Sequence, residues 1–154
     1  MVKSKRKAIK DLAQSKIVNI SDYRELQTGQ EAQRIAIVTS NQEYFEKLRQ
    51  EFPTALHIER FDGRFAFEQS LKSQQEWDAV LLDERDLKDE ALQICEKMKR
   101  QNRQEELVLF ILSEDTSKDR VRIGLEKGCD EWVSRVEDTS GIVRLLDHHI
   151  NFSR

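Results

Sequence analysis

Residues 77–83 read Trp-Asp-Ala-Val-Leu-Leu-Asp, a short apolar run that ends in a carboxylate. The four consecutive apolar residues at 79–82 leave no polar face, which is typical of a strand covered on both sides in a parallel sheet. Asp83 would then lie at the carboxyl end of a central strand, the edge at which open α/β sheets place their ligands and their chemistry. Residues 86–100 predict a helix, because apolar side chains recur there at steps of four, three and four.

Four more apolar runs with the character of strands surround this unit. They lie at residues 35–38, 55–61, 107–112 and 129–133, and the run at 107–112 is the most apolar in the chain. A stretch with helical spacing of apolar residues follows each of them. A strand followed by a helix, repeated five times, predicts an α/β fold in which a doubly wound five-stranded parallel sheet is flanked by five helices.

Polar and conformationally special residues mark the ends of several predicted helices. Ser40 followed by Glu43 has the spacing of a capping box and predicts the start of the first helix after residue 38. Pro53 is expected to end that helix. Gly128 is expected to end a later helix, at the position after the last turn where helices commonly place a glycine.

Residues 1–33 differ in composition from the rest of the chain. Five basic residues occur in the first ten positions: Lys3, Lys5, Arg6, Lys7 and Lys10. The apolar stripe of this segment is too narrow for a core of its own, so we expect a basic N-terminal extension that packs loosely or becomes ordered on a partner. Contact with nucleic acid through residues 1–10 is a second interpretation, which the lack of interleaved aromatic residues disfavours. The folded domain is expected to span residues 34–154.

The length and composition of the chain fit one cytoplasmic domain. At 154 residues it is long enough to bury a proper core, and a formal net charge of -3 argues against a protein coated by nucleic acid. Cys95 and Cys129 lack metal-ligand spacing and are expected to be reduced core residues. No run is long enough to cross a membrane and no secretory signal is evident, so we expect a cytoplasmic protein without membrane contact.

Three short motifs lie at the ends of the third, fourth and fifth predicted strands. They are Asp-Ala-Val-Leu-Leu-Asp at residues 78–83, Leu-Phe-Ile-Leu-Ser at 109–113, and Gly-Cys-Asp-Glu-Trp-Val-Ser-Arg at 128–135. In this register on this pattern of strands and helices, the chain resembles a response-regulator receiver domain from residue 34 into the last predicted helix. The resemblance implies a CheY-like architecture with the flavodoxin-like strand order 2-1-3-4-5.

The resemblance also assigns roles to four residues. In that family, the aspartate that ends strand three accepts a phosphoryl group from a histidine kinase, and an acidic pair after strand one helps to hold Mg²⁺. A hydroxyl after strand four and a lysine after strand five bind the phosphoryl oxygens, and an aromatic residue on strand five reports the switch. Asp83 is thus the phosphoacceptor equivalent, Ser113 the hydroxyl and Trp132 the switch aromatic, while Arg135 stands at the position of the lysine.

The predicted pocket departs from the family pattern in three places. Thr39 and Ser40 replace the acidic pair, so Asp83 is left to supply the carboxylate charge that Mg²⁺ prefers. Glu114 stands where the family usually keeps a small residue and would crowd the approach. Arg135 has a planar guanidinium that can bind Asp83 through two hydrogen bonds. Because phosphoryl transfer relies on the metal to neutralise charge, these departures predict that Asp83 is not phosphorylated at a useful rate.

Each of these residues also has a purely structural interpretation. Asp83 would be a strand-end carboxylate that is satisfied by Arg135, by Ser113 or by a helix N-terminus. Ser113 would be a strand-end cap. Trp132 would be a half-buried aromatic residue with its N–H group in solvent.

The remaining groups with metal-binding or catalytic chemistry are few. His148 and His149 are neighbours on a predicted helix, where adjacent side chains diverge, and His57 stands alone on a predicted strand. The sequence has no zinc-ligand spacing and no glycine-rich phosphate loop. We therefore expect no enzyme activity, no metal and no cofactor, and Mg²⁺ would be needed only by a working receiver.

These observations favour a pseudo-receiver, a phosphorylation-independent module for protein–protein interaction or signalling. The main alternative is a working two-component response regulator phosphorylated on Asp83, in which Glu84 or another nearby acid completes the metal site. A third interpretation is a nucleic-acid-binding regulator that acts through the basic N-terminus, although no winged-helix or helix-turn-helix pattern supports it.

The expected partner is another signalling protein or a second copy of the chain. Receivers commonly pair through their fourth helix, fifth strand and fifth helix, so the resemblance implies this face as the interface. Its candidate residues are Arg120, Arg122, Lys127, Trp132, Arg144 and Asp147.

Overall fold

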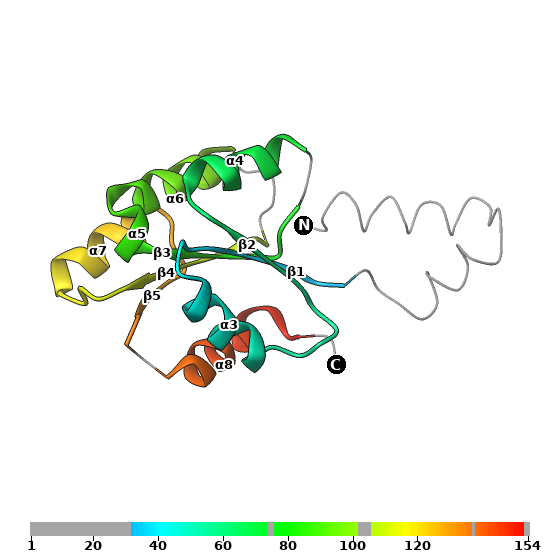
Figure 1. The fold of residues 1–154 in the computed structure, drawn as a ribbon. Helices are drawn as coiled ribbons and strands as arrows, with labels where there is room; N and C mark the ends of the chain where they lie inside the picture. The colour runs from blue at the N-terminus through cyan, green and yellow to red at the C-terminus, as the bar shows by residue number, and fades with distance from the viewer. Residues whose placement is uncertain (1–31, 74–75, 102–105, 137, 153–154) are drawn as a thin grey trace.

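Within the part of the chain that the structure describes, five parallel strands form one sheet between two layers of helices (Figure 1). The computed structural model describes residues 32–73, 76–101, 106–136 and 138–152. The strands are β1 (Arg34–Val38), β2 (His57–Phe61), β3 (Ala79–Asp83), β4 (Val108–Ser113) and β5 (Glu131–Ser134). They lie in the order β2-β1-β3-β4-β5 and every neighbouring pair is parallel, which confirms the predicted topology.

The helices of the described residues cover both faces of this sheet. They are α3 (Gln42–Glu51), α4 (Arg64–Lys72), α5 (Glu84–Leu87), α6 (Asp89–Gln101), α7 (Lys118–Glu126) and α8 (Thr139–Ile150). In Figure 1, α3 and α8 lie on one face, and α4, α5, α6 and α7 lie on the other. The sheet therefore separates two apolar cores, as expected for a doubly wound fold.

The two central strands β3 and β4 are buried along their whole length. Successive side chains point to opposite faces, so Leu81 and Phe110 pack in the core beside α3 and α8. Leu82 and Ile111 pack in the other core, beside α4 and α6. The prediction that both apolar runs are covered on two sides is confirmed.

The helix predicted at residues 86–100 is two helices, and this prediction was wrong in its boundaries. The Asp83 side chain accepts a hydrogen bond from the backbone N–H of Arg85 and caps α5, which therefore begins at Glu84. Lys88 follows α5 with a φ of 54° and a ψ of -133°, and this non-helical conformation ends α5 before α6 begins at Asp89.

The cap of α3 also differs from the prediction. Asn41, and not Ser40, is the N-cap residue, because its side-chain oxygen accepts a hydrogen bond from the backbone N–H of Tyr44 at 2.9 Å. The backbone N–H of Ser40 instead donates to Asp86. The expected stop at Gly128 is confirmed: α7 ends two residues earlier and the glycine has a φ of 112°.

Gln33 directly precedes β1, next to the residue at which the folded domain was expected to begin. Its side chain is buried and donates to the carbonyl oxygens of Ile150 and Asn151, at 3.0 and 3.1 Å, so this residue is anchored to the end of α8. The basic cluster of residues 1–10 lies outside the described residues. Among the helices that are described, none combines the length and the apolar character that a membrane span requires.

Candidate functional site

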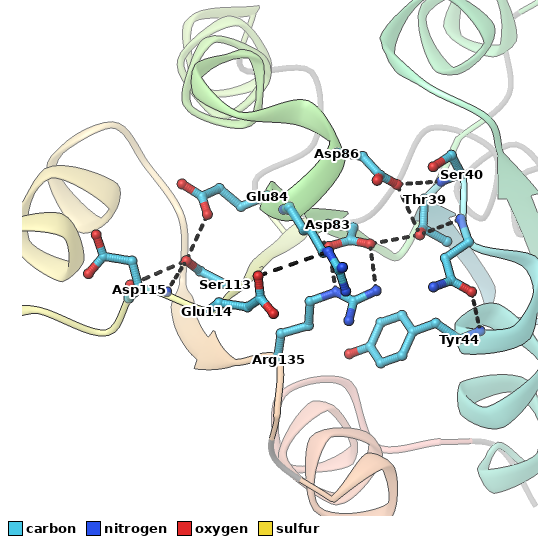
Figure 2. Close-up of polar contacts among 12 residues, drawn as sticks. Thr39, Ser40, Tyr44, Asp83, Glu84, Asp86, Ser113, Glu114, Asp115 and Arg135 are labelled. Carbon is cyan, nitrogen blue, oxygen red and sulfur yellow. Dashed lines mark hydrogen bonds and ion pairs between the residues drawn. The ribbon is translucent and has the colours of Figure 1, made fainter.

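The carboxyl ends of the parallel strands meet at one edge of the sheet, and the candidate site lies there (Figure 2). Asp83 ends β3 and pairs in register with Leu112 of β4. Thr39 directly follows β1, and Arg135 directly follows β5. The fold therefore brings together residues that are up to 96 positions apart in the chain, as expected for a doubly wound sheet.

The Asp83 carboxylate is fully buried and both of its oxygens are engaged. Oδ1 accepts hydrogen bonds from Arg135 Nε at 2.9 Å and from the backbone N–H of Arg85 at 3.2 Å. Oδ2 accepts from Thr39 Oγ1 at 2.8 Å and from Arg135 Nη2 at 3.2 Å. The bidentate pair that the sequence allowed is thus present, and the Arg135 side chain is itself only 10% exposed.

Tyr44 of α3 packs against the Arg135 guanidinium, and the sequence analysis did not predict this contact. The guanidinium carbon lies 4.1 Å from the centroid of the tyrosine ring, which is a cation–π contact. The hydroxyl of Tyr44 is buried without a hydrogen-bond partner in the described residues. Burial raises the pKa of Tyr44 to about 12, and the charge of Arg135 lowers it only in part.

The charge state of Arg135 follows from the same contacts. Burial alone lowers its pKa, but the hydrogen bonds and the charge of Asp83 outweigh burial and raise the pKa of the guanidinium above its usual value. Arg135 is therefore a permanent cation in the position where it neutralises the buried carboxylate.

Asp86 of α5 supplies a second carboxylate at this edge, and our sequence reasoning missed it. Its Oδ2 accepts from the backbone N–H of Ser40 at 2.6 Å and from Thr39 Oγ1 at 3.3 Å. Burial raises the pKa of Asp86, but the hydrogen bonds from Ser40 and Thr39 outweigh burial and lower the pKa overall. The signal that could have found it is helical spacing, since the third residue after Asp83 returns to the same side of a helix that starts there.

The Ser113 hydroxyl bonds to Glu84 and Asp115, and Asp83 is bound by other groups. Ser113 Oγ donates to Glu84 Oε1 at 2.8 Å and accepts from the backbone N–H of Asp115 at 2.9 Å. Glu84 in turn accepts from Arg120 Nη2 of α7 at 2.8 Å. Glu84, Ser113, Asp115 and Arg120 form a separate polar cluster, which we call the α7 network, beside the Asp83 pocket. Figure 2 shows Glu84, Ser113 and Asp115 of this network.

Trp132 is half-buried, as expected, and its N–H group contacts the α7 network at an exposed position. The indole Nε1 donates to the carbonyl oxygen of Asp115 at 2.9 Å, and the Arg120 guanidinium carbon lies 5.6 Å from the ring centroid. The ring packs against Gly124 of α7 so closely that a Cβ at this glycine would overlap it. Trp132 is therefore fixed from three sides.

The remaining predicted residues lie at the rim of the site or on α7 and α8. Glu114 is 54% exposed and lies 4.0 Å from the Nε of Arg85, so its carboxylate is at the rim. Arg122 bonds to Glu126 at 3.1 Å, and Lys127 bonds to Glu96 at 3.0 Å.

The two candidates on α8 have different environments. Arg144 is exposed. Asp147 Oδ1 accepts a hydrogen bond from the backbone N–H of Phe152 at 2.7 Å, so this carboxylate holds the chain that follows the helix.

The fold is that of response-regulator receiver domains. The BeF3-activated DrrB receiver domain superposes with a TM-score of 0.65 and 18% identity, over 78% of this chain and 98% of that one. A response regulator from Thermotoga maritima gives a TM-score of 0.69 with 12% identity, over 78% and 98% of the two chains. An atypical orphan response regulator, whose structure is described as revealing a new phosphorylation-independent regulatory mechanism, gives 0.61 with 14% identity, over 78% and 97%. No family model matches the sequence, and no curated protein matches it.

The donor set of this edge does not fit the Mg²⁺ ion that the fold implies. The carboxylates of Asp83 and Asp86 both bond to Thr39, but the Arg135 guanidinium already occupies two of the four acceptor directions on Asp83. Glu84 points away into the α7 network. No three His, Cys, Asp or Glu side chains are grouped around a common centre in the described part of the chain. A hard cation that needs several oxygen ligands therefore lacks its ligand set here.

Proposed function

We propose that this protein is a pseudo-receiver, a cytoplasmic signalling module that works through contacts with other proteins and without phosphoryl transfer to Asp83. The observation that supports this most directly is the bidentate Arg135–Asp83 pair. In the receiver family the equivalent aspartate is a nucleophile, whereas here both carboxylate oxygens are held by Arg135, Thr39 and a backbone N–H.

The electrostatics of the pocket support the same function. A phosphoryl donor is anionic, so its approach to Asp83 needs positive charge that is free to bind the transferred group. The positive charge of Arg135 instead neutralises the Asp83 carboxylate, which would be the nucleophile. Breaking this ion pair would leave a buried carboxylate unpaired. The receiver fold is then kept as a scaffold, in which a fixed internal ion pair replaces the phosphorylated state.

The test is incubation of the full chain with acetyl phosphate and Mg²⁺, followed by intact-mass measurement. We expect no phosphoryl adduct on the wild type. Arg135→Lys alone should not restore the reaction, because Thr39 and Ser40 still supply no carboxylate. A single adduct on the wild type that is absent from Asp83→Asn would show that the protein is a working receiver, and a receiver of known activity serves as the control for the reagent.

One observation favours the working receiver as a second candidate. Asp86 places a carboxylate within hydrogen-bond distance of Thr39, which also binds Asp83, so two acids face one another across this hydroxyl. If Arg135 swung out, these two acids could begin to form a cation site. The variant Arg135→Ala should then take up a phosphoryl group in the same assay, whereas a pseudo-receiver stays unmodified in both forms.

The working surface that we propose is the face formed by α7, β5 and α8, which either pairs two copies of this chain or binds another signalling protein. Its candidate residues are Arg120, Arg122, Lys127, Trp132, Arg144 and Asp147. Charge reversal at the exposed Arg144 should weaken self-association as measured by light scattering at several concentrations. Lys47→Glu is the matched control, because Lys47 is 64% exposed on α3, which is not part of the proposed face. A wild type that is monomeric at every concentration would remove the homodimer and leave the other partner.

A further inference from the structure

A groove lies between α4 and α6, separate from the Asp83 pocket, and it borders the face formed by α7, β5 and α8 through the Glu96–Lys127 ion pair. In Figure 1 these two helices run side by side over the sheet face opposite α3 and α8. Two hollows of about 640 and 360 Å³ lie here, and Lys97 and Gln101 line both of them; we call the two hollows together the groove. Glu68 bridges the two helices, since its Oε2 accepts from Lys97 Nζ at 3.0 Å and from Arg64 Nε at 3.4 Å.

An exposed aromatic side chain lines this groove. Phe65 of α4 is 75% exposed, and it is the one aromatic residue among the exposed large apolar side chains of the described chain. Leu71 lies about one and two-thirds turns further along the same helix and also lines the groove. Contiguous exposed apolar surface with a polar rim is typical of sites where another molecule binds.

The charge of the groove is opposite to that of the whole chain. Its lining contains the cations Arg64, Lys72, Lys97 and Arg100 against two carboxylates, whereas the chain has a net charge of -3. Glu68 holds two of these cations and Glu96 lies 3.8 Å from Arg100. Lys72 is exposed at the end of α4 and makes no ion pair in the described residues, so it is available to an anionic partner.

We infer that the groove binds an acidic amphipathic segment of another protein. Apolar side chains of that segment would cover Phe65 and Leu71, and its carboxylates would meet Lys72 and Arg100. Charge argues against two other occupants: residues 1–10 of this chain carry five basic residues, and two copies of the groove would bring like charges together. The inference goes beyond the proposed function, because it involves neither Asp83 nor the face formed by α7, β5 and α8.

The experiment is site-specific photocrosslinking in the cells that make the protein. Phe65→benzoylphenylalanine in the full chain places the reactive group in the groove with little change of shape. Lys47→benzoylphenylalanine is the control, since Lys47 is 64% exposed on α3, which belongs neither to the groove nor to the face formed by α7, β5 and α8. The crosslinked peptide is then sequenced by mass spectrometry. We expect a crosslink from position 65, absent from position 47, to a segment of another protein that alternates acidic and apolar residues.

Two further variants test the charge. Lys72→Glu in the position-65 background should lower the crosslink yield about tenfold, on the scale of one like-charge contact in an interface, whereas Lys72→Arg should retain it. Circular dichroism of both variants checks that they are folded. A crosslink to this chain itself, to a second copy, or to a segment without acidic residues would overturn the inference, and so would the absence of any crosslink at position 65. None of these results depends on whether Asp83 accepts a phosphoryl group.

Discussion

Asp83 and Glu84 are consecutive carboxylates at the end of the same strand, and each is bound to one arginine. Asp83 points into the pocket, is fully buried and binds Arg135, which is 10% exposed. Glu84 points the other way, is 16% exposed and binds Arg120, which is 25% exposed. Because α5 starts here, two neighbours in sequence belong to two different networks.

The difference in burial teaches which pair the fold depends on. Removing one partner of a buried ion pair leaves an uncompensated charge in a low dielectric, which costs about 3–5 kcal/mol. A partly exposed charge is still solvated when its partner is removed, so the same change costs about 1 kcal/mol or less. The chain therefore depends on Arg135 structurally, whereas Arg120 can rearrange at low cost.

The largest expected effect tests the buried side of this comparison. Arg135→Ala should lower the free energy of unfolding by about 3–5 kcal/mol, because the Asp83 carboxylate loses two hydrogen bonds and its counter-charge. Urea unfolding followed by far-UV circular dichroism measures this loss.

The control for this prediction is the double variant Asp83→Asn with Arg135→Met. Removing both charges together should cost less than the sum of the two single changes, since neither charge is then left buried alone. If Arg135→Ala leaves the free energy of unfolding almost unchanged, water reaches Asp83. Burial of the Asp83–Arg135 pair would then no longer support a pseudo-receiver.

Tyr44, which contacts Arg135, is expected to have a smaller effect on the free energy of unfolding, and only at alkaline pH. The folded pKa of Tyr44 is about 12, above the usual value of 10, so the unfolded chain loses this proton first as the pH rises. This part of the stability is complete below pH 10 and is lost between pH 10 and 12. Tyr44→Phe cannot lose the proton, so relative to the wild type it should gain about 1 kcal/mol at pH 11.

Near neutral pH the same variant should be as stable as the wild type or slightly more stable. The reason is that the Tyr44 hydroxyl is buried without a partner in the described residues, so its removal breaks no hydrogen bond. Urea unfolding at pH 8, 10 and 11 separates the two effects. An equal difference between wild type and variant at all three values would contradict the raised pKa.

The sequence predicted the sheet well, because each central strand is a continuous run of apolar residues. A strand that is buried on both faces must be apolar at every position, so this pattern is easy to recognise. The pairing of Asp83 with Arg135 was also within reach, since both lie at the carboxyl ends of strands of one parallel sheet. These inferences need only the position of a residue along its strand.

The direction of side chains at the strand ends could not be predicted in the same way. Ser113 was expected at the Asp83 pocket, but it bonds to Glu84, and Thr39 and Arg135 bind Asp83. The break at Lys88 divides the helix predicted at residues 86–100 into two helices. Asp86 lies in the first of them, where it bonds to the backbone N–H of Ser40. Such choices depend on competition between partners, which apolar periodicity does not record.

The smallest effect, and the sharpest test of the comparison, is the salt dependence of the two ion pairs. The coupling free energy of each pair is measured by a double-mutant cycle, with Glu84→Gln and Arg120→Met for one pair and Asp83→Asn and Arg135→Met for the other.

At low salt we expect the Glu84–Arg120 coupling to be about 1 kcal/mol or less. Because the Debye length shrinks from about 10 Å at 0.1 M to about 3 Å at 1 M salt, this coupling should approach zero at 1 M, since both side chains reach solvent. The Asp83–Arg135 coupling should change little over the same range, because salt ions cannot enter between two buried groups 2.9 Å apart. Equal salt dependence of the two couplings would show that the pocket is open to solvent, and the two arginines would then differ in geometry but not in environment.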